Sequence, residues 1–334
     1  MTASPDRPTR RRAITIFAAA AASTLVGSPA RSSADYEWHG VALGADATIL
    51  FNGLEHATAR AAIELVEVEI SRLEDALSLF RQNSELCRLN RDGLLQSPGA
   101  DLRRALTLAL DTATASGGLF DPTVQALWEA HVDWFAAAPS AATLPEELIA
   151  RARLAVDWRR VTIEPSSICL GQDQRVTLNG LGQGYVTDRI AELLNGRGLK
   201  HVLVDLGEQR AIDARLDGAP WRIARAGGPP IRLRHGALAT SEGAGCVLGA
   251  GGAAHHLFDP RSGRSAAHWK TVTVHHNSAA VADALSTTFY IASAAEIVAL
   301  LPRFPGTVVW ARDYANHDWH WIAAPVAGVE LREV

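Results

Sequence analysis

Apolar residues recur every three or four positions over residues 58–80, and this spacing predicts an amphipathic helix. Ile63, Val66 and Ile70 lie on its apolar face. A similar pattern over residues 102–116 predicts a second helix, which ends before two glycines. Further helices are expected over residues 144–155, 186–195, 279–293 and 295–301.

Short apolar runs between these segments predict strands. A loose alternation over residues 38–51 predicts one strand with Gly44 in its middle, and residues 84–90 are expected to form a short connection. Because strands and helices do not alternate in a strict βαβ rhythm, the pattern favours an α+β fold, with packed sheets and flanking helices. The other strands are expected over residues 176–178, 201–206, 221–224, 237–240, 271–276, 307–312 and 319–323, the last two as a hairpin.

The first 34 residues have the pattern of an export signal. Three arginines, Arg10 to Arg12, precede an uncharged alanine-rich run over residues 13–27, and small residues follow. The pair Arg10-Arg11 with Ile14 resembles a twin-arginine signal, while an ordinary export signal and a buried helix are the alternatives. We therefore expect a signal over residues 1–34, a catalytic domain over residues 35–334, and a location in the periplasm without a stable membrane anchor.

Composition narrows the class of partner. The chain has 334 residues, of which 48% are hydrophobic, so it can build a large core. A formal net charge of −4 without a basic stripe argues against nucleic acid as a partner. The three cysteines lie too far apart in the sequence for a zinc site or a disulfide framework.

Residues 179–184 contain three glycines and precede a predicted helix. Glycine allows close approach of the backbone and positive φ, and the first N–H groups of a helix attract phosphate. The segment is neither a P-loop nor a clean Gly-x-Gly-x-x-Gly motif. A tight strand–helix connection without a ligand is the alternative interpretation.

Two further segments carry candidate chemistry. Asp283 and Thr287 are four residues apart, so they share one face of a predicted helix, and their oxygens suit magnesium better than zinc. A capping aspartate is the alternative. One histidine of the pair His255-His256, which precedes the turn at Asp259, is a candidate general base. A surface histidine pair is the alternative there.

Taken in chain order, eight short motifs resemble the ApbE family of FAD:protein FMN transferases. The resemblance extends from about Ala42 to Leu301. It implies a T-fold-like α+β architecture with mixed or antiparallel sheets, FAD as the substrate, Mg²⁺ as the cofactor, and transfer of FMN to a threonine or serine hydroxyl of a target flavoprotein, with release of AMP. The motifs are 42–44, 80–86, 116–124, 179–188, 204–207, 239–241, 256–263 and 283–287.

The resemblance also assigns roles to individual residues. It implies that the backbone carbonyl of Gly180 binds the metal together with Asp283 and Thr287, and that His256 is the base. The positions implied for contacts with the flavin or the adenine are Leu43, Phe80, Leu119, Phe120, Asp121, Thr177, Gln183 and Leu257.

The chain departs from the family pattern at a few of these positions. Phe80 replaces the usual tyrosine, Thr177 replaces a frequent aspartate, and Gln183 replaces a frequent lysine. Glu208-Gln209 stands where a Gly-Asp pair is common. These changes concern the details of FAD binding. Two alternative functions are an FAD pyrophosphatase that yields FMN and AMP, and a non-enzymatic periplasmic FAD-binding protein.

Overall fold

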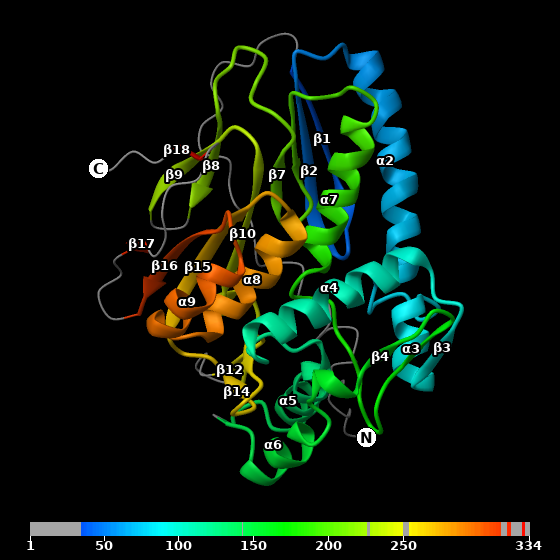
Figure 1. The fold of residues 1–334 in the computed structure, drawn as a ribbon, viewed down its shortest axis with the longest axis vertical. Coiled ribbons are helices and arrows are strands. Elements are labelled where there is room, and N and C mark those ends of the chain that lie inside the picture. The colour runs from blue at the N-terminus through cyan, green and yellow to red at the C-terminus, as the bar shows by residue number, and fades with distance from the viewer. Residues whose placement is uncertain are drawn as a thin grey trace, which may run out of the picture.

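The computed structural model describes residues 35–141, 143–225, 228–249, 254–314, 319–321 and 329–330. The predicted export signal and the last two residues of the predicted strand 319–323 lie outside these ranges. An eight-stranded sheet forms the centre, and every neighbouring pair of its strands is antiparallel (Figure 1). Its order is β1 (Asp35–Ala42), β2 (Ala45–Asn52), β6 (Val202–Asp205), β7 (Gln209–Ala211), β10 (Gly236–Glu242), β15 (Trp269–His276), β16 (Val308–Asp313) and β17 (Trp319–Trp321).

Helices cover one face of this sheet (Figure 1). They are α2 (His56–Leu77), α7 (Gly182–Asn195), α8 (Ala279–Ile291) and α9 (Ala294–Leu300). Helix α8 packs on β10 and β15, while α7 packs on β6, β7 and α8. Ile49, Leu73 and Val186 are fully buried between α2, α7 and the sheet, and Leu285 and Phe289 are fully buried beneath α8. Removing such side chains from water is the main force that holds these layers together.

A small three-stranded sheet covers part of the opposite face. It contains β8 (Trp221–Arg225), β9 (Gly228–Leu233) and β18 (Val329–Glu330). The neighbours Leu238 and Ala239 on β10 belong to different apolar clusters, because successive side chains of a strand point to opposite faces. Leu238 packs with Trp221 and Ile223 of the small sheet, and Ala239 packs beneath α8.

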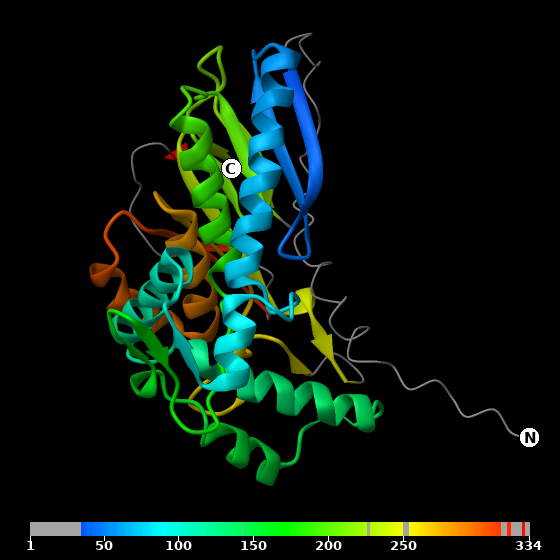
Figure 2. The ribbon, with the colours of Figure 1, turned by 90° about the vertical axis from the view of Figure 1, so that its right-hand side faces the viewer.

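A further group of helices and short strands forms the lower half of the molecule in both views (Figures 1 and 2). Helix α4 connects them to the rest, since it contacts both α2 and α8. The helices are α3 (Glu85–Asp92), α4 (Ala100–Ser116), α5 (Gln125–Ala137) and α6 (Glu146–Arg153). The short strands are β3 (Leu94–Gln96), β4 (Thr162–Ile163), β5 (Ser167–Cys169), β11 (Val247–Leu248), β12 (Ala254–His255), β13 (Phe258–Asp259) and β14 (Arg264–Ser265).

The single strand predicted over residues 38–51 is wrong. The segment forms the hairpin β1–β2, which turns at Leu43 and Gly44 with φ of 50° and 81°. A two-residue hairpin turn of this kind needs positive φ at both positions, so Gly44 lies in the turn between two strands rather than inside one. The N–H of Leu43 donates to Glu74 of α2 over 2.8 Å, which fixes the tip of the hairpin.

Two other predictions from the sequence, for residues 84–90 and 176–178, are also wrong. Residues 85–90 belong to helix α3, which the side chain of the preceding Ser84 caps by accepting from the N–H of Cys87 over 3.0 Å. Residues 176–178 are not a strand. Val176 pairs instead with the Asn90 side chain, through its N–H at 2.7 Å and its carbonyl at 2.8 Å. Side chains distant in sequence satisfy that backbone, so no local pattern reveals it.

The predicted α+β class with antiparallel sheets and flanking helices is confirmed. The hairpin expected from the last two strands is also present, as β16 pairs with β17. Within the described ranges, no helix combines the length and the apolar character needed to cross a membrane.

Candidate active site

A cavity of about 250 Å³ lies between the β1–β2 hairpin tip, the loop before α5, the glycine-rich turn and helix α8. Segments from almost the whole length of the chain therefore meet there. Every residue that the resemblance assigned to the site lines this cavity: Leu43, Phe80, Leu119, Phe120, Asp121, Thr177, Gly180, Gln183, His256, Leu257, Asp283 and Thr287.

The glycine-rich turn brings backbone against side chains of the opposite wall. A Cβ atom added to Gly180 would lie 3.1 Å from Oγ1 of Thr287 and 3.1 Å from Phe120. At Gly184 an added Cβ would lie 2.3 Å from the carbonyl oxygen of Ala279, at the start of α8. Neither glycine has positive φ, so close approach is the reason for glycine at both positions.

Helix α7 begins at Gly182, inside the glycine run rather than after it. The N–H of Gly182 donates to the Leu178 carbonyl over 2.6 Å, and the N–H of Gly184 donates to Oδ2 of Asp283 over 3.0 Å. Two of the backbone N–H groups that the sequence suggested as donors to phosphate therefore already donate within the protein. The start of α7 serves first to orient Asp283.

Asp283 is not a helix cap. It lies inside α8 and is 4% exposed, while Ser278 caps that helix. Asp188 of α7 holds the start of α8, since its carboxylate accepts from the N–H groups of Ala279 at 2.8 Å and Ala280 at 3.1 Å. Asp188 also accepts from the Ser278 hydroxyl over 2.6 Å. These bonds fix α8, and hence Asp283 and Thr287, relative to the glycine turn.

The charged groups that line the cavity are mostly acidic. Within the part of the chain that the structure describes, the lining contains no lysine or arginine. Burial raises the pKa of Asp283 to about 7. Burial, followed by the nearby charges of Asp283 and Asp205, also raises the pKa of Glu208. The carboxylates on the wall are Asp46, Asp121, Glu208, Glu242 and Asp283.

The carboxylate of Asp121 is used inside its own loop. It accepts from the N–H and the hydroxyl of Thr123, at 2.8 and 2.6 Å, and from the N–H of Trp158 at 3.2 Å. Burial is the main cause that raises its pKa. Asp121 therefore shapes the loop that carries Leu119 and Phe120 along the cavity wall.

The donors around Gly180 fit a hard divalent cation. Asp283 and Thr287 offer a carboxylate and a hydroxyl, and Thr287 lies against Gly180, which offers backbone oxygen. Oxygen donors of this kind suit Mg²⁺. Among the described residues, no three His, Cys, Asp or Glu side chains gather in a way that would hold a metal, so a zinc cage of these residues is not found there.

The two neighbouring histidines have different environments. His256 lines the cavity, and its Nδ1 lies 3.3 Å from the Cys246 carbonyl. Because a carbonyl only accepts, Nδ1 donates, and in the neutral ring Nε2 carries the lone pair. Burial, with a smaller contribution from His255, lowers the pKa of His256 to about 4. His255 does not line the cavity and bonds through Nε2 to the Ala266 carbonyl at 2.8 Å.

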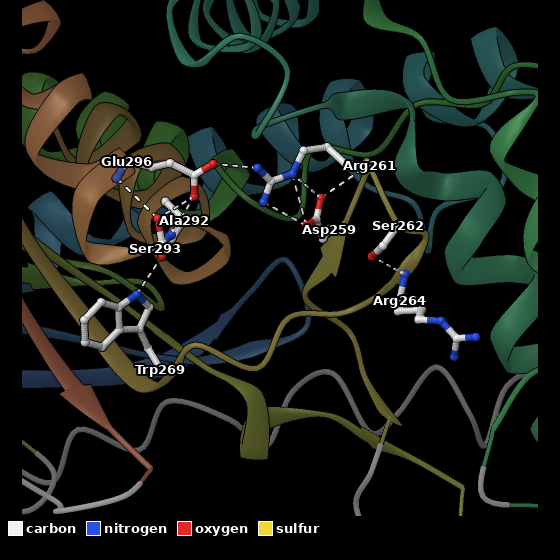
Figure 3. Close-up of polar contacts among 8 residues, drawn as sticks. All are labelled: Asp259, Arg261, Ser262, Arg264, Trp269, Ala292, Ser293 and Glu296. Carbon is white, nitrogen blue, oxygen red and sulfur yellow. Dashed lines mark hydrogen bonds and ion pairs between the residues drawn. The ribbon is translucent and has the colours of Figure 1, made fainter.

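The turn after His256 is tied to helix α9 (Figure 3). Asp259 accepts from the N–H and the guanidinium of Arg261, at 2.8 and 2.9 Å. The same guanidinium donates to Glu296 over 2.6 Å, and Glu296 forms a capping box with Ser293. The indole N–H of Trp269 donates to the Ala292 carbonyl over 2.7 Å and holds the end of α8 in the same region. This network positions the segment that carries His256.

Sequence reasoning missed several residues of the cavity wall. Glu208 was noted only as a departure from the family pattern, and Trp128 lies on α5, a helix that was not predicted. Ser241 was part of a recognised motif, but no role was assigned to it. Its hydroxyl lies 3.4 Å from that of Thr287, a contact across 46 residues of sequence that no local pattern indicates.

Comparison with known proteins finds relatives of this chain. The model of the ApbE family matches residues 43–310. The FAD:protein FMN transferase of Vibrio cholerae is 30% identical over 241 residues, which cover 66% of this chain and 72% of that protein. The protein of the same name from Treponema pallidum is 29% identical over 288 residues, which cover 75% of this chain and 76% of that protein.

Solved structures show the same fold. The ApbE protein of Thermotoga maritima superposes with a TM-score of 0.75 at 22% identity, over 86% of this chain and 96% of that one. The flavinyl transferase ApbE of Pseudomonas stutzeri, in its apo form, gives a TM-score of 0.74 at 21% identity, over 88% and 96%.

Proposed function

This chain belongs to the ApbE family, and from that membership we propose that it transfers FMN from FAD to a threonine or serine hydroxyl of a target flavoprotein, with Mg²⁺ as cofactor and AMP as the second product. The chain is an enzyme of the flavin transferase class, so a role limited to flavin binding does not fit. The observation that carries the specific proposal is the cavity that combines the Gly180, Asp283 and Thr287 oxygens with His256.

The charge of the cavity supports a metal-dependent reaction. The diphosphate of FAD is anionic, and the described wall offers it carboxylates but no basic side chain. Bringing phosphate oxygens beside buried carboxylates is costly unless a cation compensates their charge. A divalent cation held by Gly180, Asp283 and Thr287 would neutralise the charge that develops as the phosphate bond to AMP breaks.

His256 would act on the acceptor hydroxyl. The hydroxyl oxygen forms a bond to the phosphorus on the FMN side, its proton moves to Nε2 of His256, and the bond between that phosphorus and the AMP oxygen breaks with its electrons going to AMP. The hydrogen bond from Nδ1 to the Cys246 carbonyl keeps the accepting nitrogen in the correct tautomer. The low pKa of His256 keeps the ring neutral at pH 7.

The remaining wall would bind the two halves of FAD. We propose contacts with the flavin or the adenine for residues from five separate parts of the chain. They are Leu43, Phe80, Leu119, Phe120, Asp121, Thr177, Gln183 and Leu257. Since the Asp121 carboxylate is already engaged with Thr123 and Trp158, its contribution is to the shape of the site.

The test is an incubation of the protein with FAD, Mg²⁺ and a candidate acceptor protein. The proposal predicts one AMP released for each FMN attached to the acceptor. Release of AMP and free FMN in the absence of an acceptor, at an undiminished rate, would instead indicate an FAD pyrophosphatase.

We also propose that residues 1–34 direct export by the twin-arginine route to the periplasm. Replacing Arg10 and Arg11 together with lysine should leave the full-length precursor inside the cell, as seen by fractionation. Export of the double variant at the normal rate would contradict this route.

A further inference from the structure

Glu208 is a second buried carboxylate in the cavity, beside the one assigned to the metal. Glu208 is 5% exposed and Asp283 is 4% exposed, and both residues line the cavity. Glu208 lies in the short loop between β6 and β7, and its backbone carbonyl accepts from the Thr187 hydroxyl of α7 over 3.3 Å. The loop is therefore held against the helix that also orients Asp283.

Neither carboxylate is paired with a cationic side chain in the described part of the structure. Oδ2 of Asp283 accepts from the N–H of Gly184, and Oε2 of Glu208 accepts from the N–H of Thr240 over 3.2 Å. Carboxylates removed from water are found paired with a cation or bound to a metal, because the cost of burying an isolated charge is high. One backbone donor for each carboxylate does not offset that cost.

The contact to Thr240 places the Glu208 carboxylate beside β10, at a point where the next residue of that strand contacts the helix that carries Asp283 and Thr287. Thr240 is followed by Ser241, whose hydroxyl lies 2.7 Å from that of Ser286 and 3.4 Å from that of Thr287. Gly207, which precedes Glu208, packs closely against Gln183. A Cβ atom added to Gly207 would lie 2.6 Å from the amide carbon of Gln183. Strand β10 and helix α7 thus hold the Glu208 carboxylate toward the wall that contains Asp283 and Thr287.

We propose that Glu208 is a further ligand of the divalent cation, so that the ion is bound by this protein before FAD arrives. This inference rests on the proposed metal site. With Glu208, the site has two carboxylates, a hydroxyl and a backbone carbonyl. Mg²⁺ is usually bound through one or two carboxylates together with waters and substrate phosphates. A second carboxylate adds an oxygen ligand and a negative charge, so the protein binds the ion more tightly while water still occupies the positions that phosphate would take.

The test is a titration with Mn²⁺ in the absence of FAD, followed by electron paramagnetic resonance of the free ion. Glu208→Gln keeps an oxygen that accepts from Thr240 but loses the charge, so its Kd for Mn²⁺ should rise about tenfold or more. Asp283→Asn should weaken binding similarly. Glu242→Gln is the matched control, because it removes a carboxylate from the same wall and should change the Kd by less than about threefold.

The outcomes separate this inference from the proposed function. If Asp283→Asn weakens Mn²⁺ binding and Glu208→Gln binds like the wild type, the inference is wrong and the metal site stands. If neither change has an effect, both are wrong. An equal loss in Glu242→Gln would show a general effect of charge and would also overturn the inference. If circular dichroism shows that Glu208→Gln does not fold, Glu208→Asp is measured instead. This variant keeps the charge but has a shorter side chain, so its Kd for Mn²⁺ should rise by less than the rise expected for Glu208→Gln. A wild-type Kd in Glu208→Asp would contradict the assignment of Glu208 as a metal ligand.

Discussion

Asp283 is the residue on which the proposed chemistry depends most. Asp283→Asn keeps an acceptor for the Gly184 N–H but removes the negative charge from the proposed metal site. We expect AMP formation at saturating FAD and Mg²⁺ to fall by about 10²–10⁴, which corresponds to several kcal/mol of lost transition-state stabilisation. Asp46→Asn, at an exposed carboxylate on the same wall, is the control and should stay near the wild-type rate. A normal rate for Asp283→Asn would remove it from the mechanism.

His256 gives a prediction about pH. The ring accepts a proton only when neutral, and its pKa is lowered to about 4 by burial. Because its pKa is lowered, His256 stays neutral, and can accept a proton, at lower pH than an ordinary histidine can. At saturating Mg²⁺, kcat should be flat from pH 7 to about 5 and fall only near pH 4, whereas an unperturbed histidine would lose half its activity near pH 6.5. His256→Gln should lower kcat and remove this limb of the profile.

Residues that line the cavity could be predicted from the sequence only where a short motif contained them. Asp283 and Thr287 follow from a four-residue spacing on a helix, and the motif order located Gly180. Glu208 could not be found in that way. Its place at the wall depends on the Thr240 N–H and the Thr187 hydroxyl, 32 and 21 residues away in sequence.

At the scale of elements, the contact between α7 and α8 sets the site. Gly184→Ala would place a methyl group 2.3 Å from the Ala279 carbonyl and 2.8 Å from the Cα of Ala280, so the helices must separate. We expect a loss of about 1–3 kcal/mol in the free energy of unfolding, measured in urea. Separation of the helices should also weaken Mn²⁺ binding.

Gly182→Ala, two residues earlier in the same helix, is the matched control. Its added Cβ would meet Leu178 at 3.6 Å and Leu43 at 3.8 Å, which are ordinary contacts. The free energy of unfolding should stay within about 1 kcal/mol of the wild type. Equal losses for both alanine variants would show that helix packing does not distinguish the two glycines.

The long helices were predictable because their apolar period is sustained. The helix predicted over residues 279–293 is present as α8 (Ala279–Ile291), and the helix predicted over residues 102–116 is present as α4 (Ala100–Ser116). The elements that failed are short or depend on tertiary partners. The hairpin turn at Leu43 carries positive φ on a leucine, which the N–H bond to Glu74 supports and which sequence does not indicate.

At the scale of the molecule, the sheet order explains how distant segments share one cavity. Strand β7 lies beside β10, and β10 beside β15, so the loop with Glu208, the end of β10 and helix α8 are neighbours. Periodicity predicts the elements but not this order. The position of the cavity followed only from the family resemblance of the motifs, since spacing alone does not place residue 43 near residue 182.

The acidic wall predicts how FAD binding responds to removal of metal. With a chelator present, FAD should bind at least about tenfold more weakly, because its diphosphate then meets carboxylates without a compensating cation. Fluorescence titration of FAD with and without added Mg²⁺ measures this. Riboflavin, which has no phosphate, is the control and should show no dependence on metal. Equal FAD affinity in both conditions would contradict a metal bridge to the diphosphate.

The central claim is that FMN moves from FAD to a protein hydroxyl. Intact-mass spectrometry of the acceptor, after incubation with this protein, FAD and Mg²⁺, tests it most directly. The account predicts a gain equal to FMN less one water on a single threonine or serine, matched by an equal amount of AMP. With Asp283→Asn, the modified fraction in the same early time should be at least about 100-fold smaller. An acceptor of unchanged mass while AMP accumulates would contradict it.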